Sequence, residues 1–83
     1  MNNKILVTVK VPMLEKNYDI RVPISKNVRV VKELLVETIH ELSEGHFPKK
    51  SNVIIFKSDG TILSDKAILK DCGIKNGYVL TLI

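Results

Sequence analysis

The residues of this chain that could do chemistry are one cysteine and two histidines. Cys72 follows Asp71, whose negative charge disfavours the thiolate that a nucleophile requires, and neither histidine is expected near it as a base. His40 and Glu44 lie four positions apart, so they would share a helix face, and His46 follows closely. A zinc site needs a fourth ligand, which these three residues do not supply. We therefore predict no catalytic residues, no metal site and no cofactor.

The charge is positive overall, at a formal +4, but it is unevenly placed. The segment 28–44 carries four glutamates and only two basic residues. Proteins that bind single-stranded nucleic acid usually combine a basic groove with stacking aromatic side chains. Here Lys49-Lys50 is the only adjacent basic pair, and we expect no row of aromatic residues on an open sheet face. These features argue against a nucleic-acid partner, although purely electrostatic, salt-sensitive binding is kept as an alternative.

The length of 83 residues predicts a single domain spanning residues 1–83. Cys72 is the only cysteine, so no internal disulfide can form, which favours a reducing cytoplasmic location. No stretch approaches the ~20 apolar residues that cross a bilayer. We therefore expect no direct membrane insertion.

The first part of the chain predicts a β-hairpin. Apolar residues alternate with polar ones over residues 5–11, and again over residues 18–22. Residues 15–17 read as the turn between these strands, and Pro12 and Pro23 close them.

From Val28 the apolar period changes to three and four residues, which predicts an amphipathic helix ending near Leu42. Asn27, or alternatively Ser25, is expected to cap its first amides. Gly45 is placed to adopt the left-handed conformation after its last turn. An acidic ridge follows the exposed side of this helix: Glu33, Glu37 and Glu41.

The second half of the chain reads as short strands and turns. The apolar run 53–56 predicts a central strand, and residues 78–83 predict a last strand that lies beside the first in parallel. Between them come a turn at 58–61, a brief strand at 62–63, a short helical turn ending at Gly73, and a tight turn at 76–77. The sequence therefore predicts an α+β fold with a mixed sheet of four to five strands and one helix packed on one face.

This order of elements resembles ubiquitin and its β-grasp relatives over essentially the whole chain. The resemblance is carried by Ile54-Ile55-Phe56, Asp59-Gly60, Leu63-Ser64-Asp65, Gly73-Ile74 and Leu80-Thr81-Leu82. More narrowly, Leu69-Lys70-Asp71-Cys72-Gly73-Ile74-Lys75-Asn76-Gly77, followed by an apolar strand, is similar to the YukD/EsaB family. Those are small ubiquitin-like proteins associated with type VII secretion systems of Gram-positive bacteria.

The resemblance implies a non-enzymatic, cytoplasmic accessory or regulatory component that binds a protein partner, a cytoplasmic part of the secretion machine. Conjugated modifiers and sulfur carriers of this fold end in a flexible Gly-Gly tail, whereas this sequence ends in Leu82-Ile83 and holds no Gly-Gly pair. That difference argues against conjugation. A modifier or sulfur-carrier relative and a basic nucleic-acid-binding β-grasp protein remain the alternatives.

The side of the sheet away from the helix is the predicted partner-binding surface. The helix is expected to cover one set of side chains: Ile5, Val7, Val9, Ile20, Val22, Ile54, Phe56, Leu80 and Leu82. The opposite side is expected to bind the partner, through Leu6, Thr8, Lys10, Arg21, Ile55 and Thr81. The sequence leaves open whether this sheet face or the acidic helix ridge is the surface that binds.

Overall fold

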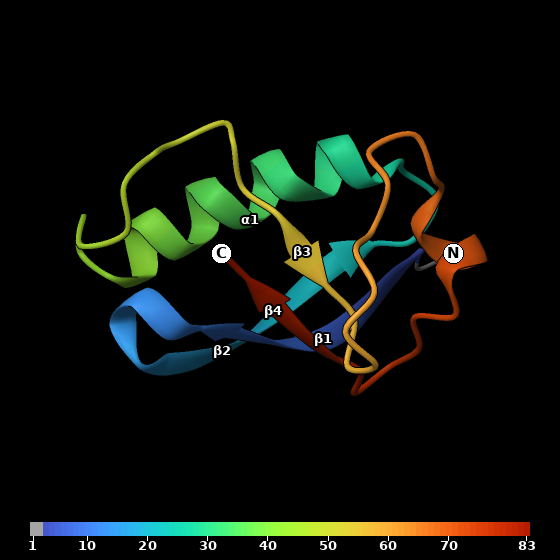
Figure 1. Cartoon of the computed structure of the whole chain (residues 1–83), viewed down its shortest axis with the longest axis horizontal. Coiled ribbons are helices and arrows are strands. Elements are labelled where there is room, and N and C mark those ends of the chain that lie inside the picture. The colour runs from blue at the N-terminus through green and yellow to red at the C-terminus, as the bar shows by residue number, and fades with distance from the viewer. Residues whose placement is uncertain (1–2) are drawn as a thin grey trace.

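The computed structural model describes residues 3–83 and shows one sheet with one α-helix lying across it (Figure 1). The sheet has four strands in the order β2-β1-β4-β3. In chain order the elements are β1 (Lys4–Val11), β2 (Lys16–Pro23), α1 (Val28–Leu42), β3 (Ile55–Phe56) and β4 (Val79–Leu82), with short 3-10 turns at Pro12–Leu14 and Leu69–Cys72.

β1 and β4 form the centre of the sheet and run parallel, as the sequence predicted. β1 pairs antiparallel with β2 over its full length, and β4 pairs antiparallel with β3. The α+β class, the mixed four-stranded sheet and the single helix on one face are therefore confirmed.

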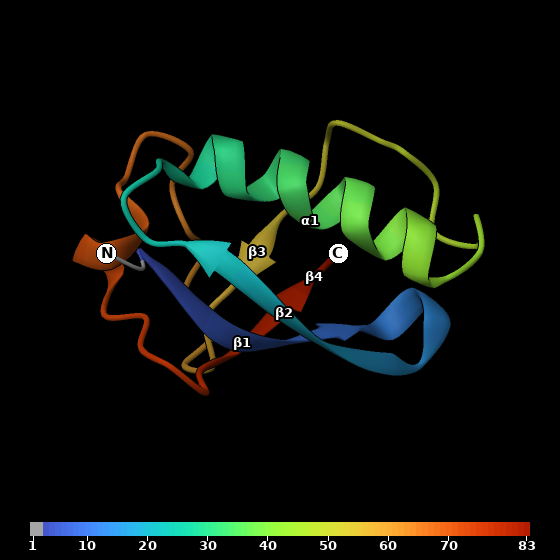
Figure 2. The same ribbon diagram turned by 180° about the vertical axis from the view of Figure 1, so that it is seen from behind.

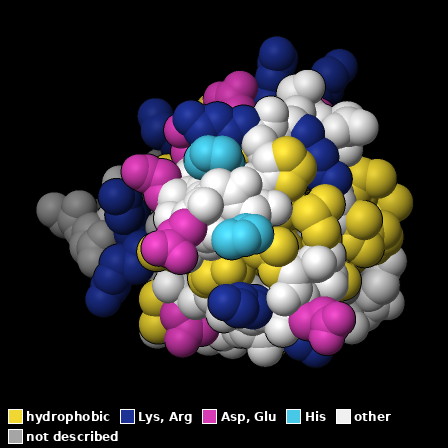
Figure 3. All heavy atoms as spheres, turned by 90° about the vertical axis from the view of Figure 1, so that its left-hand side faces the viewer, with side chains coloured by type: hydrophobic (Ala, Val, Ile, Leu, Met, Phe, Trp, Pro, Cys, Tyr) yellow, Lys and Arg dark blue, Asp and Glu magenta, His cyan; other side chains and the backbone are white. Residues whose placement is uncertain are grey.

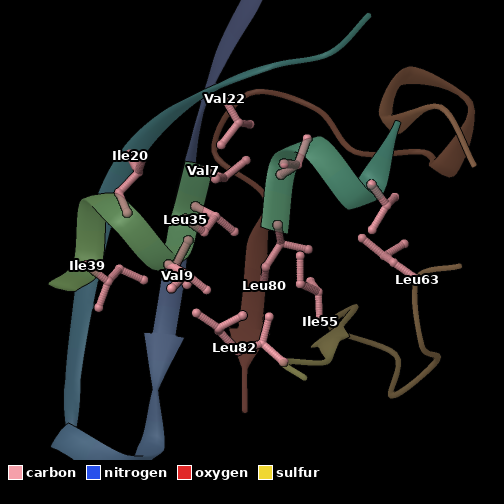
Figure 4. Packing of buried hydrophobic residues seen from close by; sticks show 14 of the residues in the cluster. Val7, Val9, Ile20, Val22, Leu35, Ile39, Ile55, Leu63, Leu80 and Leu82 are labelled. Carbon is pink, nitrogen blue, oxygen red and sulfur yellow. The ribbon is translucent and has the colours of Figure 1, made fainter. Parts of the chain in front are cut away.

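Helix α1 begins where the sequence predicted, because the Asn27 side chain accepts a hydrogen bond from the Val30 N–H at 3.0 Å. Its buried side packs on the sheet through Val28, Val31, Leu35, Val36 and Ile39. Figure 4 shows Leu35 and Ile39 among the inward side chains of β1, β2 and β4. Leu42, which belongs to the predicted apolar stripe, is 55% exposed because it lies in the last helical turn, beyond the core. Gly45 has a φ of 86°, so its predicted left-handed conformation is confirmed.

The run 53–56 differs from its prediction in two respects. Its strand, β3, has two residues and lies at the edge of the sheet, not at the centre. The side-chain assignment is also wrong by one position: Val53 and Ile55 are buried, whereas Ile54 is 38% exposed. Phe56 pairs with Thr81 on the side away from the helix. A continuous apolar run has no alternation from which its orientation can be read.

Within residues 3–83, no helix is long and apolar enough to cross a membrane.

Candidate partner-binding face

The open face of the sheet is formed by the outward residues of all four strands. On β1 these are Leu6, Thr8 and Lys10, since the residues between them, Val7 and Val9, are completely buried. Leu6 lies opposite Arg21, and Thr8 lies opposite Asp19 on β2. On the other side of β1, Thr8 pairs with Val79 and Lys10 pairs with Thr81. The structure therefore brings together five of the six residues predicted from sequence: Leu6, Thr8, Lys10, Arg21 and Thr81.

Ile55 is the predicted residue that does not reach this face. Its side chain is 0% exposed and pairs in register with Leu82, which is also in the core. Figure 4 shows Ile55 pointing into the cluster beside Leu80 and Leu82. The placement of Ile55 on the open face was wrong, and Phe56 takes its place.

A shallow hollow of about 340 Å³ lies over the β3–β4 half of the open face. Apolar atoms reach it from Phe56, Val79 and Ile83, and the last of these is 53% exposed. Lys10 and Thr81 border it on the sheet. Sequence reasoning missed Phe56, because the run 53–56 gave no sign of which residues point outward.

The rim of this hollow is held by the Tyr78 hydroxyl. Its oxygen accepts hydrogen bonds from the Ser58 N–H at 3.3 Å and the Ser58 hydroxyl at 3.0 Å. The turn beyond Ser58 is braced by Asp59, whose Oδ1 accepts from both the N–H and the hydroxyl of Thr61. The bond from the Thr61 N–H, and then the bond from its hydroxyl, hold the pKa of Asp59 below its usual value. The turn beside Phe56 is therefore held by hydrogen bonds at both of its ends.

The β1–β2 half of the face is polar. The Thr8 hydroxyl donates to Asp19 Oδ1 at 2.8 Å, across the two strands. The Asn76 side chain accepts from the Leu6 N–H at 2.7 Å and so ties the last turn to β1. The open face thus combines an apolar hollow with a polar, partly charged border, which is the composition of a non-obligate protein interface.

The two histidines hydrogen-bond to backbone carbonyl groups near the C-terminal end of helix α1. His40 Nδ1 lies 2.7 Å from the Phe47 carbonyl oxygen, and His46 Nδ1 lies 2.7 Å from the Ser43 carbonyl oxygen. Because a carbonyl oxygen can only accept, each ring nitrogen donates to the backbone. Both histidines are visible on the same end of the molecule (Figure 3).

In the part of the chain that the structure describes, no cluster of three or more His, Cys, Asp or Glu side chains is arranged to hold a metal. Cys72 Sγ is 3.4 Å from the Ile68 carbonyl oxygen, within its own turn.

A mixed sheet in the order 2-1-4-3 with one helix across one face is the ubiquitin-like β-grasp fold. The structure superimposes on the ubiquitin-like domain of the Mycobacterium tuberculosis type VII secretion system protein EccD1 with a TM-score of 0.76 at 20% identity, covering 100% of this chain and 99% of that domain. The ubiquitin-like domain of the Arabidopsis thaliana protein At2g32350 matches with a TM-score of 0.68 at 26% identity, covering 99% of this chain and 78% of that one.

A chain of the MycP5-free ESX-5 inner membrane complex gives a TM-score of 0.80 at 15% identity, and the match covers 99% of this chain but 21% of that one. No curated protein matches the sequence. The family model of protein YukD of the WXG100 protein secretion system (Wss) matches residues 6–82. The chain therefore belongs to the YukD family.

Proposed function

We propose that this chain is a single ubiquitin-like domain that acts, without catalysis, as a cytoplasmic accessory or regulatory component of a type VII secretion system. Its role is to bind another protein, a cytoplasmic part of the secretion machine, through the open face of the sheet. The family supports the link to WXG100 secretion. The EccD1 domain and the ESX-5 chain, which share the fold, support a partner within the secretion machine.

The observation that carries the choice of face is the hollow beside Phe56. Binding energy at interfaces is concentrated in a few central side chains, often aromatic, that become fully desolvated. Phe56 offers an aromatic side chain of this kind. Val79 and Ile83 add apolar surface around it, and Lys10 lies at their border.

The helix face is the competing surface. A groove of about 600 Å³ runs along α1, but its apolar residues, Val36 and Val53, are already buried. Four of its charged side chains are also paired, since Lys32 bonds Asp65 at 2.6 Å and Lys49 lies 3.4 Å from Glu37. Fewer groups remain there for a partner, so the open sheet face is favoured.

The proposal includes binding without conjugation, and the hydrogen bonds of Ile83 support it. The N–H and the carbonyl of Ile83 both bond Ile54, each at 2.9 Å. Entry of this segment into an activating enzyme would require these bonds to break. Intact-mass analysis of the protein from cells should show the free chain, and a covalent adduct would refute this part of the proposal.

The test is titration of the purified protein with each cytoplasmic domain of the secretion machine. One domain should bind, and Phe56→Ala should weaken that binding about 30-fold or more, as expected for a central aromatic anchor. Leu42→Ala is the control, because Leu42 is also a large apolar side chain that reaches solvent, at 55% exposed, but lies at the end of α1. Equal affinities for Phe56→Ala and the wild type would exclude the open face, and binding by no domain would exclude this partner class. A parallel titration with single-stranded DNA tests the nucleic-acid alternative.

A further inference from the structure

The two edges of the sheet differ in how they are covered. The edge at β3 is covered by residues 61–63, which hydrogen-bond to it and to Lys57. The Leu63 N–H donates to the Ile55 carbonyl at 3.0 Å, and the Lys57 N–H donates to the Thr61 carbonyl at 2.8 Å. Beyond β2, no strand is paired within the described residues. Figure 2 shows β2 at the front of the sheet in that view. An eight-residue strand with an uncovered edge is a template for further pairing.

The hydrogen bonds fix which backbone groups of β2 point outward. Leu6 and Thr8 bond toward β4, since the Leu6 carbonyl accepts from Gly77 and the Thr8 N–H donates to Tyr78. The residues between them, such as Val7, therefore bond toward β2, where the register pairs Val7 with Ile20. The even-numbered residues of β2 consequently bond to β1. Outward N–H and carbonyl groups belong to Asn17, Asp19 and Arg21, together with the carbonyl of Pro23.

Two opposite charges occupy this edge. The side chains of Asp19 and Arg21 are both exposed on the open face. Arg21 makes no ion pair with any residue that the structure describes. One oxygen of Asp19 is held by the Thr8 hydroxyl at 2.8 Å, which leaves its second oxygen free to accept.

We propose that β2 pairs with β2 of a second copy of this chain, antiparallel and centred on Ile20. In this register Asp19 lies opposite the partner's Arg21, and Arg21 lies opposite the partner's Asp19. In both of these pairs the backbone groups of the two residues also hydrogen-bond to each other. The register therefore forms two ion pairs and gives partners to the outward N–H and carbonyl groups at the same positions. The two four-stranded sheets become one continuous sheet.

The charges of Asp19 and Arg21 favour the register centred on Ile20 over the registers centred on either of these two residues. A shift that centres the pair on Asp19 puts this carboxylate against the same residue of the partner. A shift that centres it on Arg21 does the same with two guanidinium groups. Like charges directly opposite destabilise a strand pair, so only the register centred on Ile20 is favoured by both residues. The pairing is independent of the proposed secretion function.

The symmetry of the pair has a geometric consequence. Its two-fold axis passes midway between the two copies of Ile20, perpendicular to the sheet, so both helices lie on one side and both open faces lie on the other. The two hollows beside Phe56 would therefore face the same direction.

The test uses two charge reversals and their mixture. Wild-type protein should show a concentration-dependent dimer by sedimentation velocity. Arg21→Asp and Asp19→Arg should each weaken self-association about 10-fold or more, because each replaces two attractive cross-strand pairs with like charges. An equal mixture of the two variants should dimerise as well as the wild type, because each then faces its complement. Lys66→Asp, the same reversal at an exposed lysine outside the sheet, should leave the dimer unchanged.

Backbone hydrogen exchange gives a second measurement that does not depend on any substitution. The amides of Asp19 and Arg21 should become protected as the wild-type concentration rises, whereas they should remain unprotected in Arg21→Asp. A wild-type protein that stays monomeric would overturn the proposal. So would a dimer that survives Arg21→Asp, or a failure of the mixture to restore pairing when both variants are folded by circular dichroism.

Discussion

Replacing Ile55 and Ile54 with alanine, one at a time, removes the same side chain from opposite faces of the sheet. Ile55 is 0% exposed, so truncation deletes three buried carbon atoms at about 0.8 kcal/mol each and leaves a cavity. We expect Ile55→Ala to lower the free energy of unfolding by about 3–4 kcal/mol. Ile54 is 38% exposed, so its truncation should cost about 1.5 kcal/mol, with no enclosed cavity.

Urea denaturation measures this difference directly. For a chain of this size the slope is about 1–1.5 kcal/mol/M, so the midpoint should fall by about 2–4 M for Ile55→Ala and by about 1–1.5 M for Ile54→Ala. The slopes of the two variants should agree with that of the wild type, since the calculation assumes an unchanged unfolded state. If the Ile54 variant were the less stable of the two, residues 53–56 would have the orientation predicted from sequence, and the position assigned to Phe56 would be wrong.

Two further outcomes follow from single hydrogen-bonding groups. Asn27→Ala removes the cap of α1 and should lower the free energy of unfolding by about 1 kcal/mol, or the melting temperature by about 4–8 °C. Ser25→Ala is the control and should leave both quantities unchanged. Equal melting temperatures for the two variants would mean that the cap is dispensable. The pKa of Asp59 is lowered from 3.8 by its bonds from Thr61, so its carboxylate stabilises the fold above that pH, and this contribution is lost as the pH falls through the folded-state value. Asp59→Asn should therefore reduce the loss of thermal stability on acidification in this range, and identical acid profiles for the two proteins would contradict the assignment.

The hairpin and the helix could be predicted because their sequences carry a clear period. The alternation along β1 and β2 identified which residues face the helix, and the buried residues Val7, Val9, Ile20 and Val22 agree with it. Asn27 was recognisable as a cap from its residue type and its place before the apolar stripe.

The run 53–56 could not be oriented, because every residue in it is apolar and both orientations bury two of them. Its position at the edge of the sheet was equally hidden, since an apolar run is typical of a central strand. The outward side chains were therefore placed correctly on β1, β2 and β4, where neighbouring polar residues mark the outward side. They were placed wrongly on β3, where no such residue exists.

The edge pairing depends on information of another kind. Asp19 and Arg21 are visible in the sequence, but which backbone groups point away from β1 follows only from the register and from the bonds of Leu6 and Thr8 to the last turn. If β2 were shifted by one residue along β1, the side chains of Asp19 and Arg21 would face the helix instead of solvent.

The pairing of β1 with β4 also determines how this protein folds. The Leu6 N–H bonds the Asn76 side chain, 70 positions further along the chain, and the parallel ladder beside it joins equally distant segments. Such contacts require a long loop to close before they stabilise anything, so folding is expected to be slower than in a helical protein of this size. On the ribosome, the sheet cannot gain its second central strand until residues 79–82 have left the exit tunnel. Up to that moment the nascent chain presents an unpaired strand edge and uncovered apolar side chains, to which a chaperone could bind.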